Sequence, residues 1–242
     1  ETIEQINYRF GFPETLVLDT DLLMFEQDVA RIAHTCTIKH YIKNFSISSP
    51  EFKEIDGIAY TRNGNKLVAC SAGKEHVVVP DGVKTIGKYA FANCHIKSLI
   101  LPDSVTTIGA YAFEECKDLE SVVLGGNIEV IGENAFESCK KLTSIVIPPS
   151  VYSIGDYAFL HSGLEDIRLN EGLQHIGAMA FSGTKIKSLQ LPASVVYLRT
   201  ECIDDTMMEV IMPSFKKDVC KGFIKTFRPF LKNDTVLRLR CG

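Results

Sequence analysis

The sequence lacks the long apolar runs and the one-sided charge that mark membrane-spanning proteins and dedicated polyanion binders. No apolar stretch in its 242 residues approaches the roughly 18 to 20 residues that span a bilayer. The 26 Lys and Arg residues nearly balance the 30 Asp and Glu residues, which leaves a formal net charge of -4. The composition, 45% hydrophobic and 23% charged, is that of a globular protein able to bury a core. We therefore expect neither a membrane span nor a nucleic acid partner.

Motifs that carry catalysis or bind metals are also lacking. There is no Gly-x-Ser-x-Gly elbow, and Gly125-Gly126-Asn127 is a turn rather than a phosphate loop. The nearest approach to a metal site is the cluster of His34, Cys36 and His40. A zinc site needs about four donors, and no second Cys/His cluster completes this one. The sequence therefore predicts no catalytic residue, no metal site and no cofactor, and an enzyme is not expected.

What the sequence does contain is an internal repeat. The pattern Val-x-x-Ile-Gly-x-x-Ala-Phe-x-x-Cys begins at Val83, and its central apolar residue returns every 22 or 23 residues. That residue is Ile86, Ile108, Ile131, Ile154, Ile176 and, in a sixth degenerate copy, Leu198. A period of this length is typical of a solenoid, in which each repeat buries its apolar face against its neighbours.

Each copy also carries a short alternating run, such as Leu99-Ile100-Leu101, that predicts a strand with its outer residues inward and its middle residue outward. Strands from successive copies would stack in parallel about 4.8 Å apart. We therefore predict an α/β or mainly-β solenoid of parallel strands with a 22-23 residue period and terminal caps. The outward residues would be Ile100, Val123, Val146, Arg168, Gln190 and Ile211.

The other repeat positions are explained by packing. The phenylalanines would stack as a spine: Phe91, Phe113, Phe136, Phe159 and Phe181. The glycine that follows each central isoleucine fits a turn where a side chain would clash or strain the backbone. Cys94, Cys116 and Cys139 share a position with Ser162, so we expect small buried side chains there rather than disulfides. Cys220 with Cys241 is the one pairing that stays open.

The repeat at residues 142–159 reads Leu-x-x-Ile-x-Ile-Pro-x-Ser-Val-x-x-Ile-Gly-x-x-Ala-Phe, with Ser162 in the cysteine position. This motif resembles the BspA-type leucine-rich repeat, and the resemblance covers about residues 55–213. It implies a leucine-rich-repeat solenoid. It also implies a surface-exposed or secreted protein of anaerobic bacteria or mucosal parasites, often an adhesin, and it supplies no catalytic residues. The chain departs from the general pattern, because no asparagine ladder is present.

We expect four consecutive segments within one continuous domain. Residues 1–54 would form an N-terminal cap with a degenerate repeat, and residues 55–80 a hairpin insertion and the entry to the array. The dipeptide Asn63-Gly64 is a strong tight-turn signal within that insertion. Residues 81–213 would hold six repeats of the BspA type, and residues 214–242 a basic, aromatic C-terminal cap.

The first candidate binding surface is the outward row of the predicted sheet. It consists of Ile100, Val123, Val146, Arg168 and Gln190, with Tyr152 and His175 on neighbouring outward positions. Exposed apolar patches often mark contact surfaces, and solenoids usually bind through their open sheet. The alternative is that β-branched residues suit any strand and that three of them cover too little area to indicate binding.

The second candidate is the basic C-terminal segment, in which eight Lys and Arg residues face two Asp residues. Lys217, Lys221 and Lys225 recur every four residues and would share one face of a helix. The plain interpretation is a cap helix that shows its lysines to water. The alternative is a patch for a polyanion, whether sulfated glycan, anionic lipid or nucleic acid, of which we favour sulfated glycan.

Taken together, these patterns and the family resemblance predict a non-enzymatic protein-binding module for adhesion or recognition. Its expected location is the bacterial cell surface or the secreted fraction, and its partner a protein such as a host matrix or cell-surface protein. The alternative is an intracellular scaffold, or the recognition domain of a larger multidomain protein.

Overall fold

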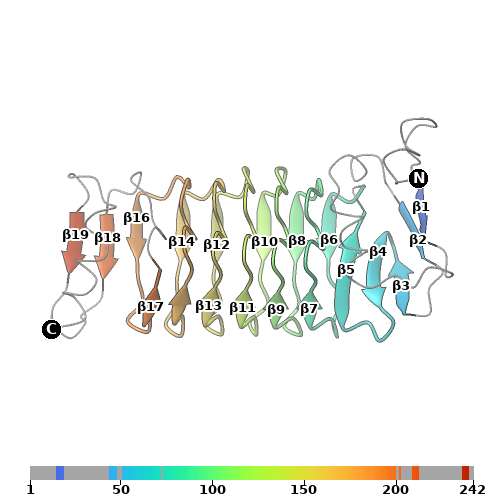
Figure 1. Cartoon of the computed structure of the whole chain (residues 1–242), viewed down its shortest axis with the longest axis horizontal. Coiled ribbons are helices and arrows are strands. Elements are labelled where there is room, and N and C mark those ends of the chain that lie inside the picture. The colour runs from blue at the N-terminus through green and yellow to red at the C-terminus, as the bar shows by residue number, and fades with distance from the viewer. Residues whose placement is uncertain are drawn as a thin grey trace.

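The computed structural model is an elongated stack of β-strand coils (Figure 1). It describes residues 15–18, 44–47, 51–71, 73–199, 202, 209–212 and 236–239. Over these residues it is a parallel β-solenoid of about six turns and contains no helix, so the predicted solenoid is confirmed. Accordingly, none of its described elements could cross a bilayer as a helix.

One row of strands comes from the alternating run of each coil. Its members are β6 (His76–Val78), β8 (Ser98–Ile100), β10 (Ser121–Val123), β12 (Ser144–Val146), β14 (Asp166–Arg168), β16 (Ser188–Gln190), β18 (Glu209–Met212) and β19 (Val236–Leu239). Pairing within this row is parallel, as between Val122 and Leu99, and it is interrupted between β10 and β12 and between β14 and β16. The predicted alternation is confirmed in β8, where Leu99 is buried and Ile100 is exposed. We call this the first row.

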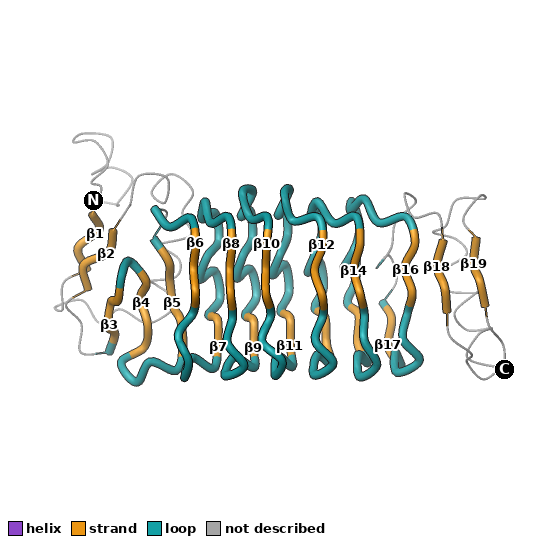
Figure 2. Tube along the Cα trace, turned by 180° about the vertical axis from the view of Figure 1, so that it is seen from behind, coloured by secondary structure: helices purple, strands orange, loops and turns teal. Residues whose placement is uncertain are grey.

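A second row of strands corrects the expectation of one sheet. Its members are β7 (Thr85–Ile86), β9 (Thr107–Ile108), β11 (Val130–Ile131), β13 (Ser153–Ile154), β15 (His175–Ile176) and β17 (Tyr197–Leu198). They pair in parallel in one continuous sheet. Figure 2 shows the first row in front and the second row behind it. The sequence did not reveal the second row, because two residues are too few for an alternating pattern.

The N-terminal end of the second row is an antiparallel meander. It is made of β3 (Phe52–Ile55), β4 (Ile58–Thr61) and β5 (Lys66–Cys70), and β5 pairs in parallel with β7. Gly64 takes a φ of 76° in the turn between β4 and β5, a conformation that glycine adopts without strain. Before the meander, β1 (Thr15–Leu18) pairs in parallel with β2 (Asn44–Ile47). The boundaries of the four segments remain predictions.

The phenylalanine spine runs through the core as predicted. Phe113 and Phe136 stack at 4.9 Å between ring centroids, and Phe136 and Phe159 at 5.3 Å. All five rings are almost completely shielded from solvent. Such a continuous column of buried aromatic rings ties each coil to its neighbours.

The glycine that recurs in each repeat lies where neighbouring coils approach closely. A Cβ added at Gly109 would lie 2.8 Å from the Ile86 carbonyl oxygen, and one at Gly132 would lie 2.7 Å from the Ala110 nitrogen. Neither glycine has a positive φ, so backbone strain does not explain the glycines. The clash that a side chain would cause does. Left-handed backbone occurs instead at two non-glycine positions of the same turns, for example at Tyr89.

The repeat cysteines are buried and bonded to the preceding coil. The Cys116 thiol donates to the Phe91 carbonyl at 2.9 Å, and the Cys139 thiol to the Phe113 carbonyl at 3.2 Å. Burial raises the pKa of the Cys139 thiol. These contacts agree with the predicted packing role. The pair Cys220 and Cys241 lies outside the described residues.

Candidate functional site

The outward side chains of the first row form a contiguous apolar strip. Val78, Ile100, Val123 and Val146 lie on successive strands and are 68%, 45%, 53% and 62% exposed. Val78 and Val123 flank Ile100 in register. We call these four residues the apolar strip. Side chains this exposed contribute little to the core, so the strip is available for contact with another molecule.

Sequence reasoning missed Val78, although a signal for it was present. The run Val77-Val78-Val79-Pro80 has the same strand-then-proline pattern as Leu99-Ile100-Leu101-Pro102, and Val78 lies 22 residues before Ile100. The predicted hairpin insertion at 55–80 concealed this strand, because the run falls inside the insertion.

Beyond the apolar strip the first row becomes polar. Arg168 and Gln190 are exposed on β14 and β16, at the positions equivalent to Val146. Ile211 on β18 is half-buried. The structure therefore brings five predicted residues into one row, with an apolar half and a polar half: Ile100, Val123, Val146, Arg168 and Gln190.

Tyr152 and His175 do not join this row, which corrects the sequence-based placement. His175 belongs to β15 in the second row, and Tyr152 immediately precedes β13 there. The residues between the two strands of each coil turn the chain to the other face, and the sequence pattern does not reveal that turn. Tyr152 is 42% exposed, and the His175 ring lies 5.8 Å from the ring of Tyr197, which sequence reasoning did not select as a site residue. Tyr152, His175 and Tyr197 therefore lie in or next to the second row and not in the apolar strip.

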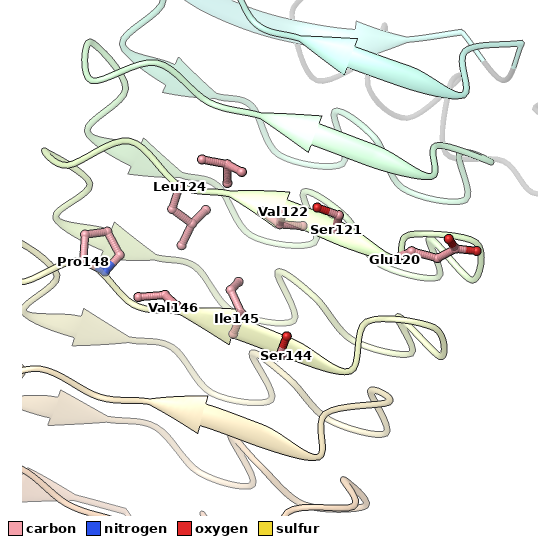
Figure 3. Close-up of a pocket in the computed structure, with 9 residues that line it drawn as sticks. Glu120, Ser121, Val122, Leu124, Ser144, Ile145, Val146 and Pro148 are labelled. Atoms are coloured by element: carbon pink, nitrogen blue, oxygen red, sulfur yellow. The ribbon is translucent and has the colours of Figure 1, made fainter.

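A cavity of about 330 Å³ opens in the apolar strip between β10 and β12 (Figure 3). Val123 and Val146 of the strip are among its lining residues. The others are Glu120, Ser121, Val122, Leu124, Ser144, Ile145 and Pro148. It lies where the first row divides, because β10 pairs with β8 and β12 pairs with β14, while β10 and β12 do not pair with each other.

Exposed ion pairs lie just before the strands of the first row. Lys97 contacts Glu75 at 2.8 Å, and Asp118 contacts both His95 and Lys141, at 2.8 and 2.9 Å. Hydrogen bonds from His95 and then from Lys141 hold the pKa of the Asp118 carboxyl below its ordinary value. Pairs this exposed add little to stability, so their main effect is to give this edge of the surface mixed charge.

Chemistry that could support catalysis is not assembled around the strip. Over the described ranges, no three His, Cys, Asp or Glu side chains are placed to hold a metal ion. Glu114 is the carboxyl with a pKa near neutrality: burial first, and then the carboxylates of Glu137 and Glu115, raise it to about 7. Glu114 lies in the turns that follow the second row, away from the apolar strip. The three predicted basic-patch residues, Lys217, Lys221 and Lys225, fall outside the described residues.

Comparison with known sequences identifies one family. The chain matches the BspA type Leucine rich repeat region in six copies over residues 84–209, which is more than half of its length. No curated protein matches it.

Three solved structures with the same fold come from bacteria. A leucine rich cell surface protein from Faecalibacterium prausnitzii is 23% identical over 75% of this chain and 44% of its own, with a TM-score of 0.54. A leucine-rich repeat protein from Bacteroides ovatus is 26% identical over 67% of this chain and 46% of its own, with a TM-score of 0.53. The pneumococcal vaccine antigen PcpA is 19% identical over 83% of this chain and 51% of its own, with a TM-score of 0.63. The chain thus spans between 44% and 51% of the length of these structures.

Proposed function

Because the chain belongs to the BspA-type leucine-rich repeat family, we propose that it is a non-enzymatic protein-binding module of a bacterial cell-surface or secreted protein. Leucine-rich repeats with bacterial surface-protein neighbours suggest a protein-interaction module. An extended solenoid suits that role, since its stacked strands offer a long and regular surface.

The observation that carries this proposal is the apolar strip. Four neighbouring coils each place an apolar side chain in solvent at the same position of the first row. In the same coils the second row carries Thr85, Thr107, Val130 and Ser153, of which only Val130 is apolar. Nothing in the fold requires an apolar residue at an exposed position. The strip is held on a rigid ladder, so a partner that covers it would lose little entropy to ordering this chain.

The proposed location is drawn by analogy with the solved structures of the same fold. The relative from Faecalibacterium prausnitzii is a cell surface protein, and the pneumococcal relative is a vaccine antigen. We propose by analogy that this chain acts at the cell surface or after secretion, in adhesion or recognition. Its partner would be a protein of the host matrix or of another cell surface.

A capture experiment with matched variants tests this function. Purified wild-type chain, Val123→Arg and Tyr152→Arg are incubated with host matrix and cell-surface extracts, and bound proteins are quantified by mass spectrometry. Val123 is 53% exposed on the apolar strip and Tyr152 is 42% exposed behind it, so both variants should fold. We expect Val123→Arg to lose partners that Tyr152→Arg retains. Capture of nothing by the wild type, or equal capture by all three proteins, would count against binding through the strip.

The basic C-terminal segment supports a second, separate proposal. Eight basic residues against two acidic ones over residues 214–242 would attract a sulfated glycan. Retention on heparin at low salt should fall in the double variant Lys217→Glu and Lys221→Glu. A wild-type chain that heparin does not retain at low salt would contradict this proposal.

A further inference from the structure

The apolar strip is flanked along one edge by charges whose sign alternates from coil to coil. The charged residues stand one or three positions before each strand of the first row. They are Glu75 for β6, His95 and Lys97 for β8, Asp118 and Glu120 for β10, and Lys141 for β12. Apart from Asp118, at 31%, these side chains are between 43% and 58% exposed. The Lys, Asp and Glu residues of the four coils are thus negative, positive, negative and positive in turn.

A row of four alternating charges complements itself when its order is reversed. A second copy can be laid on the strip by half a turn about an axis that runs along the strands, between β8 and β10. Its coils then run in the opposite order, while its strands keep their direction, so the two charged edges lie side by side. Glu75 is then opposite Lys141 of the second copy, and Lys97 is opposite Glu120. Each charge meets one of opposite sign.

The other way to lay two such faces together lacks this match. Half a turn about the long axis of the solenoid would keep the order of the coils and reverse the strands. The charged edge would then lie against the other end of the strands, where Figure 3 shows Leu124 and Pro148, far from Glu120. Exposed charge pairs add little affinity, but they select between orientations. The charges therefore favour the reversed order of coils.

The shape of the apolar strip is matched by the same reversal. The cavity of about 330 Å³ lies in the half of the strip formed by Val123 and Val146, which help to line it. The other half carries Val78, which is the most exposed residue of the strip at 68%, and Ile100. Reversal places the Val78 half of each copy over the cavity half of the other. The two copies make this contact twice.

We propose that the apolar strip binds a second copy of this chain, in a dimer whose twofold axis runs along the strands between β8 and β10. The inference goes beyond the proposed function and does not rest on it, because it names another occupant of the same surface. A contact of this symmetry closes on itself, so assembly stops at two chains. Four apolar side chains per copy make a small interface, so we expect a dissociation constant on the order of 10 to 100 µM. Below that concentration the strip is open to a protein partner.

Sedimentation velocity of the wild-type chain tests the assembly. Between about 1 and 500 µM, a range that brackets the expected dissociation constant, the average mass should rise from one chain toward two and then stop. Dilution should reverse the rise. A mass of one chain at every concentration, or a mass that continues to grow beyond two chains, would overturn the proposal.

A substitution near the axis tests the surface. Val123→Arg should weaken the dimer about tenfold or more, because it brings two arginines into the apolar contact. Tyr152→Arg is the matched control, since Tyr152 is 42% exposed and lies outside the strip. Its dissociation constant should stay within about twofold of that of the wild type. Circular dichroism first shows that both variants are folded. Equal weakening by the two variants would contradict a dimer formed through the strip.

An exchange of charges tests the orientation. Lys97→Glu and Glu120→Lys should each weaken their own dimer, because each places like charges opposite one another. A mixture of the two variants should form a mixed dimer about tenfold tighter than either variant alone. Lys185→Glu mixed with Glu165→Lys is the control, since this ion pair lies beyond the four coils of the strip. The reversed orientation is wrong if the first mixture shows no preference, or if the control mixture shows the same one.

Capture from extracts separates the dimer from the proposed function. The chain is used about tenfold below its measured dissociation constant, so that most of it is a single chain. A wild type that never dimerises but captures proteins through the strip would refute the dimer and support the proposed function. A dimer that responds to the variants as expected, with no protein captured, would support the dimer and count against the proposed function.

Discussion

The two rows of strands come from the same coils, yet they differ in continuity and in what they show to solvent. The second row is unbroken from β7 to β17, although each of its strands has only two residues. The first row has longer strands and is divided twice, after β10 and after β14. The second row thus has the shorter strands but pairs without interruption. Contacts outside the first row must therefore hold the coils together.

The turns that follow the second row provide that cohesion. The amide of Phe113 donates to the Ala135 carbonyl of the next coil at 2.8 Å, and that of Phe136 to Ala158 at 2.7 Å. The same turns carry the ring spine, the close-approach glycines and the buried thiols. Because these contacts hold the coils together, the pairing of the first row can be interrupted without unfolding the solenoid, and its outward side chains are not needed for the core.

The largest expected effect is on the spine. Phe136→Ala should lower the free energy of unfolding by about 3 to 5 kcal/mol, because it leaves a cavity between Phe113 and Phe159. Denaturant titration followed by circular dichroism measures the loss. Val146→Ala, on the first row and 62% exposed, should change it by less than about 0.5 kcal/mol. Similar losses in the two variants would show that the first row also holds the stack together.

A smaller effect is expected at the close-approach glycines. The added Cβ of Gly132→Ala would meet the Ala110 nitrogen at 2.7 Å, and a backbone atom cannot move aside as a side chain can. We expect a loss of about 1 to 3 kcal/mol, as for other overpacked sites. Gly126→Ala is the matched control, since its Cβ would approach only the Asp103 carboxylate, at 3.4 Å. Equal unfolding midpoints for the two variants would refute the role of coil-to-coil contact.

The pH dependence of stability should be a further difference between the turns that follow the second row and the first row. In the folded chain, burial and the carboxylates of Glu137 and Glu115 raise the pKa of Glu114 to about 7. The folded chain therefore binds a proton that the unfolded chain releases at lower pH. This stabilisation is present in acid and is lost as the pH rises through about 7. Glu114 is partly exposed, so the loss should be on the order of 1 kcal/mol.

The variant Glu114→Gln checks this contribution. It should flatten the dependence of the unfolding midpoint on pH between 5 and 8, a range of roughly 3 units around the raised pKa. Capture of partners from extracts through the apolar strip should stay the same across that range, because Glu114 lies away from the first row. A wild-type midpoint that rises with pH over this range would contradict the assignment.

The sequence was sufficient to predict a solenoid, because the same buried residue types recur at the same positions of each repeat. The spacing of Ile86 and its equivalents predicted the solenoid, and the alternation around Ile100 correctly predicted which side chains face solvent. The second row was beyond this reasoning, since Thr107–Ile108 is too short to show a period. Without that row, Tyr152 and His175 were assigned to the wrong face.

The division of the first row between β10 and β12 was equally hidden. The repeats on either side of it have the same motif, and the residues of β10 match those of β8 in type, as Ser121 matches Ser98. Whether two such strands pair depends on the path of the whole coil, which includes the turns that precede each strand. A local pattern cannot carry that information, so the exposed residues Val123 and Val146 were predicted but the cavity between their strands was not.

The smallest effect on stability is expected for a substitution in the apolar strip that should still weaken binding. Ile100→Thr replaces a 45% exposed apolar side chain with a polar one that suits a strand equally well. The free energy of unfolding should change by less than about 0.5 kcal/mol. Capture of the partner from extracts should nevertheless fall, because Ile100 belongs to the apolar strip and is flanked in register by Val78 and Val123. Calorimetry and the capture assay, run on one preparation, measure both quantities. If capture is unchanged while stability drops, the apolar strip serves the fold, and the contrast between the two faces has no functional meaning.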